Sequence, residues 1–172
     1  MTFLEYLDGE LISQQQELQL LLKSIEISLE EAKQVGTIYH FTNIESLFAI
    51  LSSGVIKTSK KYYPQGFTSL TRDFNLPQHV SDIRIQQFNV RFNIDGNKLS
   101  ENIKITPFKD PKYNREELEE VIFKDIKISK YVQSIDIKIP KMSYIDTDGI
   151  QKLCKKYNIK CNIVKEFTVI NK

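Results

Sequence analysis

Three short stretches carry polar side chains that could take part in chemistry. His40 and Thr42 stand two residues apart in "TIYHFT", whose β-branched and aromatic residues are typical of a strand. Alternate residues of a strand point to the same side, so we expect the imidazole and the hydroxyl to face one cleft. Asn43 follows as a helix N-cap, and a helix N-terminus favours an anion such as pyrophosphate. The competing interpretation is a core histidine bonded to a backbone carbonyl.

The second stretch is "FTSLTRD", residues 67–73. Ser69 and Thr71 share one side of a predicted strand, with Thr68 and Leu70 on the other. Hydroxyls can position a ribose or an amide, and Arg72, where the chain enters a loop, could pair with phosphate. The alternative is an edge strand with solvated hydroxyls and a surface arginine.

The third stretch, "EELEEVIFKD" at residues 116–125, places four acids within five residues before an apolar run. A solvated helix end is the ordinary interpretation. Glu120, however, begins a β-rich segment, and a carboxylate held by a strand can stabilise developing positive charge or bind a ribose hydroxyl. Glu119 stays open as the alternative, because a change of register by one residue moves a side chain to the other face.

Composition limits the remaining possibilities. The 172 residues favour one domain with an appendage, and 24 basic against 22 acidic residues argue against wholesale wrapping of nucleic acid while leaving a local basic groove open. With only Cys154 and Cys161, and only His40 and His79, a zinc site is not expected. The thiols are predicted to be reduced and structural, and His79 to lie on the surface. Lacking a signal peptide or an apolar run of about 20 residues, the chain is expected to be cytoplasmic, without a membrane partner.

The segment 1–36 is predicted to be helical from its apolar spacing, with a capping box at Ser28 and Glu31. Its self-association is left open, as is the oligomeric state. Residues 37–172 form the main domain. There we predict a helix after Asn43 that ends at Gly54 and a terminal helix over 146–158 that begins near Asp146 or Thr147.

Short strands are expected between these helices. "FNVRFNID" alternates so that Phe88, Val90, Phe92 and Ile94 share one face, and Asp95-Gly96 predicts a turn. Further strands are expected at 37–41, 55–59, 67–70, 119–123, 131–139 and 159–164. Because strands and helices do not alternate regularly, the sequence favours an α+β fold with two small, largely antiparallel sheets.

The three polar stretches, in this order, resemble the motifs of the ADP-ribosyltransferase superfamily. "YHFTNIESLFAILSSGVI" is similar to the first motif of the DarT-type DNA ADP-ribosyltransferases, and "EVIFKDIKISKYVQSIDI" to their late motif. "FTSLTRD" occupies the place of the middle motif and is more similar to the Ser-x-Thr pattern of the arginine-type branch. The resemblance covers residues 37–140. It includes no clear match to the DNA-recognition loop, so the substrate does not carry over.

The resemblance implies an ADP-ribosyltransferase-like fold of split antiparallel sheets, with NAD⁺ as the cosubstrate and no metal. Glu120 would be catalytic, binding the ribose 2′-hydroxyl and stabilising the cation, and His40 would bond a ribose. Thr42 would help to hold the nicotinamide amide. Ser69 and Thr71 would buttress the glutamate, and Arg72 would meet the pyrophosphate. The implied NAD-binding residues are Tyr39, His40, Thr42, Ser69, Thr71 and Arg72.

The leading hypothesis is therefore an NAD-dependent ADP-ribosyltransferase that modifies a macromolecule, either nucleic acid or protein; its small size suits a phage or toxin-type effector. One alternative is a non-catalytic module on the same fold that binds protein partners. Another is an RNA 2′-phosphotransferase, whose family relies on arginines for the 2′-phosphate. This chain offers only four arginines, at Arg72, Arg84, Arg91 and Arg115.

Overall fold

A computed structural model describes residues 18–20, 22, 36–60, 64, 66–107, 119–139 and 145–169. The chain divides into two compact units, residues 1–34 and 35–172. In the first unit, residues 18–20 and 22 are helical, in accord with the predicted helix, and their leucines are exposed. The rest of that predicted helical segment, including the capping box at Ser28, lies outside the described residues.

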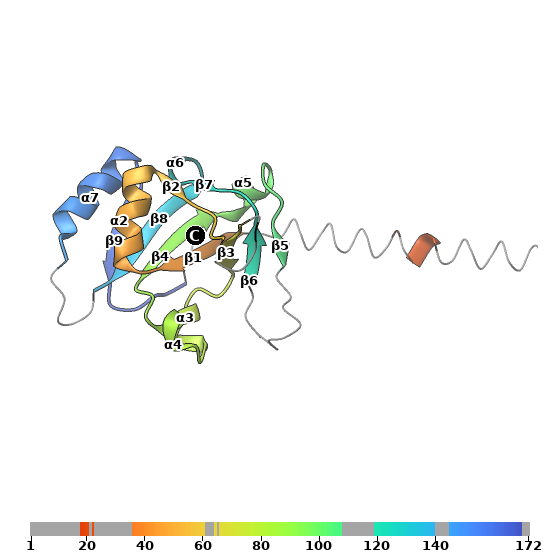
Figure 1. Ribbon diagram of the computed structural model, residues 1–172, viewed down its shortest axis with the longest axis horizontal. Helices are drawn as coiled ribbons and strands as arrows, with labels where there is room; N and C mark the ends of the chain where they lie inside the picture. The colour runs from red at the N-terminus through yellow and green to blue at the C-terminus, as the bar shows by residue number, and fades with distance from the viewer. Residues whose placement is uncertain are drawn as a thin grey trace, which may run out of the picture. The chain divides into compact units, whose positions relative to one another are not determined.

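The second unit is built on a seven-stranded sheet (Figure 1) with the order β5-β6-β3-β1-β4-β8-β9. Every neighbouring pair is antiparallel except β8 and β9, which are parallel. The strands are β1 Thr37–Thr42, β3 Thr68–Thr71, β4 Val90–Asp95, β5 Thr106–Pro107, β6 Glu119–Ile122, β8 Val132–Lys138 and β9 Lys160–Val164. The fold is therefore mixed α+β with a mostly antiparallel sheet, as the sequence predicts.

The prediction of two small sheets is not met, because one of the two sheets is large. Beside the large sheet there is only a two-stranded ladder in the described part of the chain, formed by β2 Val55–Ile56 and β7 Ile126–Lys127. The large sheet grows because short strands far apart in sequence pair with each other, as β3 does with both β1 and β6. Such non-local pairing cannot be derived from local sequence patterns.

The first long helix of this unit, α2 Ile44–Ser53, begins and ends as predicted. The Asn43 side chain accepts a hydrogen bond from the Ser46 amide at 2.8 Å. Gly54 ends the helix in the left-handed conformation at φ +73°, which glycine adopts without steric cost. An added Cβ there would also lie 3.0 Å from the Tyr157 hydroxyl, so the position favours glycine twice.

The terminal helix, α7 Thr147–Lys156, has Asp146 as its N-cap, which accepts from the Gly149 amide at 2.9 Å. The turn predicted at Asp95-Gly96 is wrong: Asp95 is instead the N-cap of α5 Gly96–Ser100, because its side chain accepts from the Lys98 amide. Aspartate suits both roles, so the sequence alone does not separate them. The other short helices are α3 Leu76–His79, α4 Ile83–Gln86 and α6 Ile128–Tyr131.

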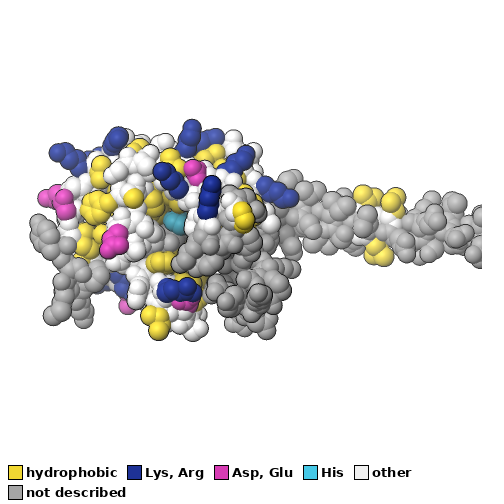
Figure 2. All heavy atoms as spheres, in the orientation of Figure 1, with side chains coloured by type: hydrophobic (Ala, Val, Ile, Leu, Met, Phe, Trp, Pro, Cys, Tyr) yellow, Lys and Arg dark blue, Asp and Glu magenta, His cyan; other side chains and the backbone are white. Residues whose placement is uncertain are grey.

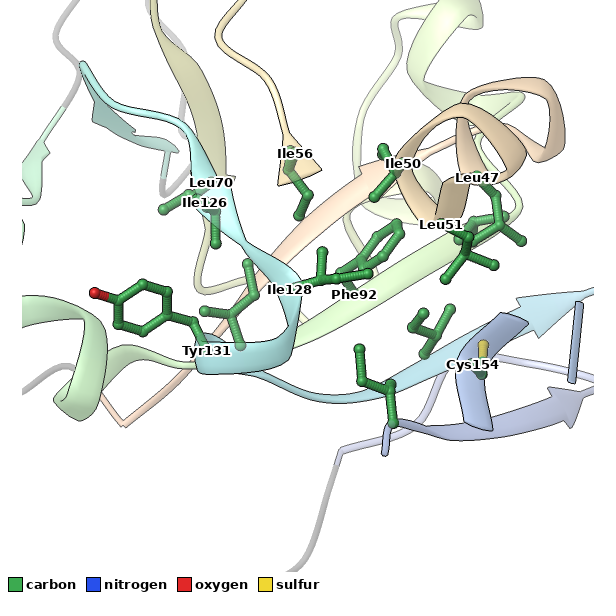
Figure 3. Packing of buried hydrophobic residues seen from close by; sticks show 14 of the residues in the cluster. Leu47, Ile50, Leu51, Ile56, Leu70, Phe92, Ile126, Ile128, Tyr131 and Cys154 are labelled. Carbon is green, nitrogen blue, oxygen red and sulfur yellow. The ribbon is translucent and has the colours of Figure 1, made fainter. Parts of the chain in front are cut away.

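The main core lies on one face of the sheet, which we call the helical face because α2 and α7 pack there side by side (Figure 1). Figure 3 shows Leu47, Ile50 and Leu51 of α2 pointing toward Phe92 of β4. The ladder contributes Ile56 and Ile126 to the same core. Burial of these apolar side chains is the main force that holds the sheet and its cover together.

The opposite face carries a smaller aromatic cluster of Tyr39, Phe41 and Phe167, with Phe74 and Phe88 packed against it. The assignment of Phe88 to one face with Val90, Phe92 and Ile94 is therefore wrong for Phe88 alone. Strand β4 begins only at Val90, so strand alternation does not extend back to Phe88. In the part of the chain that the structure describes, no helix has the length and apolar character needed to cross a membrane.

Candidate functional site

Strand pairing brings His40 and Glu120 to one face of the sheet. Tyr39 lies opposite Thr71, and Leu70 lies opposite Glu120. Because side chains alternate along a strand and paired residues point the same way, His40, Leu70 and Glu120 all lie on the helical face. Strand β3 separates the two predicted catalytic residues. The register also favours Glu120 over Glu119, which stands opposite Thr71.

The carboxylate of Glu120 is buried and only partly satisfied. The residue is 7% exposed, and its Oε1 accepts a hydrogen bond from Arg72 Nε at 2.8 Å. Its Oε2 is also buried and has no hydrogen-bond partner. Leaving a buried acceptor unpaired costs about 1–3 kcal/mol, so the unpartnered oxygen needs an explanation, and a ligand that donates a hydrogen bond to it is one.

The half-buried ring of His40 has a defined role for each nitrogen. Nδ1 lies 2.9 Å from the carbonyl oxygen of Ser69. A carbonyl can only accept, so Nδ1 donates, and in the neutral ring Nε2 is an acceptor. Burial lowers the pKa of His40, and the bond to Ser69 opposes this shift, so the ring is neutral at pH 7. The carbonyl bond expected of a core histidine is present, yet one nitrogen is left to accept from a hydroxyl.

Ser69 and Thr71 do share one side of β3, but this side faces away from His40 and Glu120. Ser69 lies opposite Val121, and the Thr71 hydroxyl accepts from the Asp73 amide at 3.0 Å. The expected buttressing of Glu120 by these two hydroxyls is therefore wrong, because the strand alternation places them with Tyr39. It is the backbone carbonyl of Ser69 that contacts His40.

Thr68 lies on the helical face, where the hydroxyls of Ser69 and Thr71 were expected from the sequence. It is 2% exposed, it lies opposite Ile122 on the helical face, and its Oγ1 is a second buried polar atom without a partner. Only the pairing register of β3 distinguishes Thr68 from Ser69, and nothing in the local sequence specifies that register. Thr42 is also buried on this face, at the end of β1 directly before the N-cap of α2.

Tyr39, predicted to bind NAD, is not brought to this face. It is buried in the aromatic cluster, where the Arg91 guanidinium lies 5.0 Å from its ring centre. Burial raises the pKa of Tyr39, and the Arg91 charge opposes the shift. Tyr39 thus belongs to the packing of the opposite face.

His79 is exposed, as predicted, but it has a partner that the sequence did not indicate. Its Nδ1 lies 2.7 Å from Asp73 Oδ2, and its ring meets Phe74 edge-on. Among the described residues, no three or more His, Cys, Asp or Glu side chains gather as metal ligands would. Cys154 and Cys161 are free thiols.

In Figure 2, one histidine side chain is visible near the middle of the main unit, and Lys and Arg side chains lie along the upper part of the same view. Exposed lysines of the described chain include Lys57, Lys124, Lys127 and Lys130, which belong to the ladder and α6 or lie beside them. No family model matches the chain, and no curated protein matches it either. The arguments about function therefore rest on this geometry.

Proposed function

We propose that this chain is an NAD⁺-dependent ADP-ribosyltransferase that modifies a macromolecule, nucleic acid or protein, on an ADP-ribosyltransferase-like fold. One observation carries the proposal: Glu120 Oε2 is buried without a partner on the face that also holds the acceptor nitrogen of His40. Two hydrogen-bond acceptors fixed on one face suit a ligand that donates from several hydroxyls, as a ribose does. The motif order of the sequence supports the same chemistry.

The residues would act as follows. Glu120 Oε2 accepts from the 2′-hydroxyl of the nicotinamide ribose, and His40 Nε2 accepts from a further ribose hydroxyl. The bond between C1′ and the nicotinamide nitrogen breaks, and nicotinamide leaves with the electron pair. The Glu120 carboxylate stabilises the positive charge that develops on the ribose. A nucleophile of the acceptor then bonds to C1′ and loses its proton.

The RNA 2′-phosphotransferase alternative gains no support from Arg84 or Arg91. Arg91 is buried on the opposite face, where it pairs with Asp136. Arg84, in α4, pairs with Asp82, the N-cap of the same helix. A non-catalytic binding module is the outcome that the following experiment separates from the proposal.

Nicotinamide release from NAD⁺ tests the proposed function. We expect slow release by the wild-type chain and a loss of about 10²–10³-fold in Glu120→Gln, the size typical of removing one preorganised electrostatic group. Glu101→Gln, at an exposed glutamate, is the matched control and should leave release unchanged. Thermal melting of all three proteins checks the fold. A wild-type chain that neither binds NAD⁺ in calorimetry nor releases nicotinamide would contradict the proposal and favour the binding module.

A further inference from the structure

Arg72 reaches Glu120 because of where β3 ends. Leu70 lies directly opposite Glu120, and Arg72 follows two residues later along the same strand direction. Its Nε donates to Oε1 at 2.8 Å, and its side chain is 34% exposed. The arginine thus bonds one carboxylate oxygen while Oε2 stays without a partner.

The hydrogen bond from Arg72 to Oε1 has a geometric consequence for Glu120. A glutamate side chain rotates about three bonds, and its carboxylate has two equivalent oxygens. A donor held at Oε1 restricts these rotations and so determines where Oε2 points. Displacing a reacting group by about 1 Å can lower a rate about 10²-fold, so the orientation of Oε2 matters for catalysis.

We infer that Arg72 is a positioning residue that acts through Glu120 and is not a ligand of the cosubstrate's pyrophosphate. This inference rests on the proposed function, because it concerns how Glu120 is held for the same reaction. A pyrophosphate ligand would contact the cosubstrate equally in the ground state and the transition state. A positioning residue acts through Glu120, whose charge counts most when positive charge develops on the ribose, so its loss falls mainly on the transition state.

The two roles predict different kinetics. Loss of a pyrophosphate contact raises KM for NAD⁺ and leaves kcat nearly unchanged. Loss of positioning lowers kcat, here by about 10–100-fold, and changes KM little. Binding of ADP gives a second readout without catalysis, because ADP carries the pyrophosphate and lacks the scissile bond.

The experiment compares the wild-type chain with Arg72→Gln, Glu120→Gln and the double variant. Arg84→Gln is the matched control, since Arg84 also pairs with a carboxylate but lies away from Glu120. We expect Arg72→Gln to lower kcat, to leave KM within about twofold and to bind ADP as the wild type does. The double variant should be no slower than Glu120→Gln alone, because Arg72 acts only through that carboxylate.

Arg72→Lys sharpens the result. It keeps the charge but loses the planar Nε–H donor, so kcat should stay low. A raised KM with weakened ADP binding, an unchanged kcat, or independent losses in the double variant would overturn the inference while Glu120→Gln stays inactive. If Glu120→Gln releases nicotinamide as fast as the wild type, the proposed function fails, and the inference fails with it. Melting curves confirm that each variant is folded.

Discussion

The two faces of the sheet each hold an arginine–carboxylate pair, and the pairs differ in how completely they are satisfied. On the face opposite the helices, Arg91 and Asp136 are 2% and 4% exposed. Asp136 Oδ2 accepts from Arg91 Nε and Nη2 and from Asn93 Nδ2, while Oδ1 accepts from Asn162 Nδ2. Both oxygens of this carboxylate therefore have protein partners.

Arg91 is as fully buried and hydrogen-bonded as Asp136. Its guanidinium donates to the carbonyl oxygens of Phe74 and Thr168, and it lies 5.0 and 5.1 Å from the ring centres of Tyr39 and Phe167. These contacts join strand β4 to the loop after β3 and to the segment after β9. A pair with so many partners is a structural link.

On the helical face, Arg72 Nε donates to Glu120 Oε1 while Glu120 Oε2 has no partner, although Glu120 is nearly as buried as Asp136. Burial and an ion pair are therefore common to both faces. The difference is the unmet hydrogen-bonding capacity, which costs stability unless a ligand supplies the missing donor. That difference is what separates a structural pair from a candidate site in this molecule.

The largest expected effect tests the structural pair. Asp136→Ala leaves the buried guanidinium of Arg91 without its charge partner, so we expect the free energy of unfolding to fall by about 3–5 kcal/mol in urea titrations. Arg84→Ala is the control, because it removes a largely exposed partner of an ion pair and leaves Asp82 as the N-cap of α4, and it should cost less than about 1 kcal/mol. A similar small loss in Asp136→Ala would remove the distinction between the two pairs.

A smaller change in the free energy of unfolding is expected at the two threonines of β3, Thr68 and Thr71. Thr71→Val removes a hydroxyl that accepts from the Asp73 amide and should destabilise the protein by about 1 kcal/mol. Thr68→Val removes a buried hydroxyl without a partner and should be neutral or stabilising by up to about 1 kcal/mol. Chemical denaturation measures both. Equal losses would mean that the Thr68 hydroxyl is satisfied in solution.

The smallest effect concerns the protonation of His40. Because its pKa is lower in the folded chain than in the unfolded chain, the unfolded chain binds more protons below about pH 6.5. The free energy of unfolding therefore falls, because of His40, as the pH drops below about 6.5. The stability gap between wild type and His40→Gln should change with pH in this window, as measured by urea unfolding. A gap that stays constant would show that the ring titrates normally.

Local sequence signals were sufficient to predict the helix ends that are set by interactions between residues close in sequence. The N-cap at Asn43, the left-handed stop at Gly54 and the helix after Asp146 all follow from interactions within a few residues, and the structure confirms them. The mixed α+β class follows in the same way from the spacing of short strands. These features depend on near neighbours, which the sequence displays directly.

Features that depend on strand pairing were not accessible in this way. The sequence indicated that Ser69 and Thr71 share a side of their strand, but not which side of the sheet this is. It also gave no sign that Arg91 pairs with Asp136, 45 positions away in the chain. Neither residue has a local pattern that distinguishes it from a surface charge.

The sequence by itself determined which residues are chemically capable and which short segments carry them, because helix caps, apolar periods and residue types are local properties. The tertiary structure alone decided that Glu120 and Thr68 join His40, and that Tyr39, Ser69 and Thr71 do not. The physical reason is the two-residue period of a strand: a register change of one residue moves every side chain to the other face, and only long-range pairing sets that register.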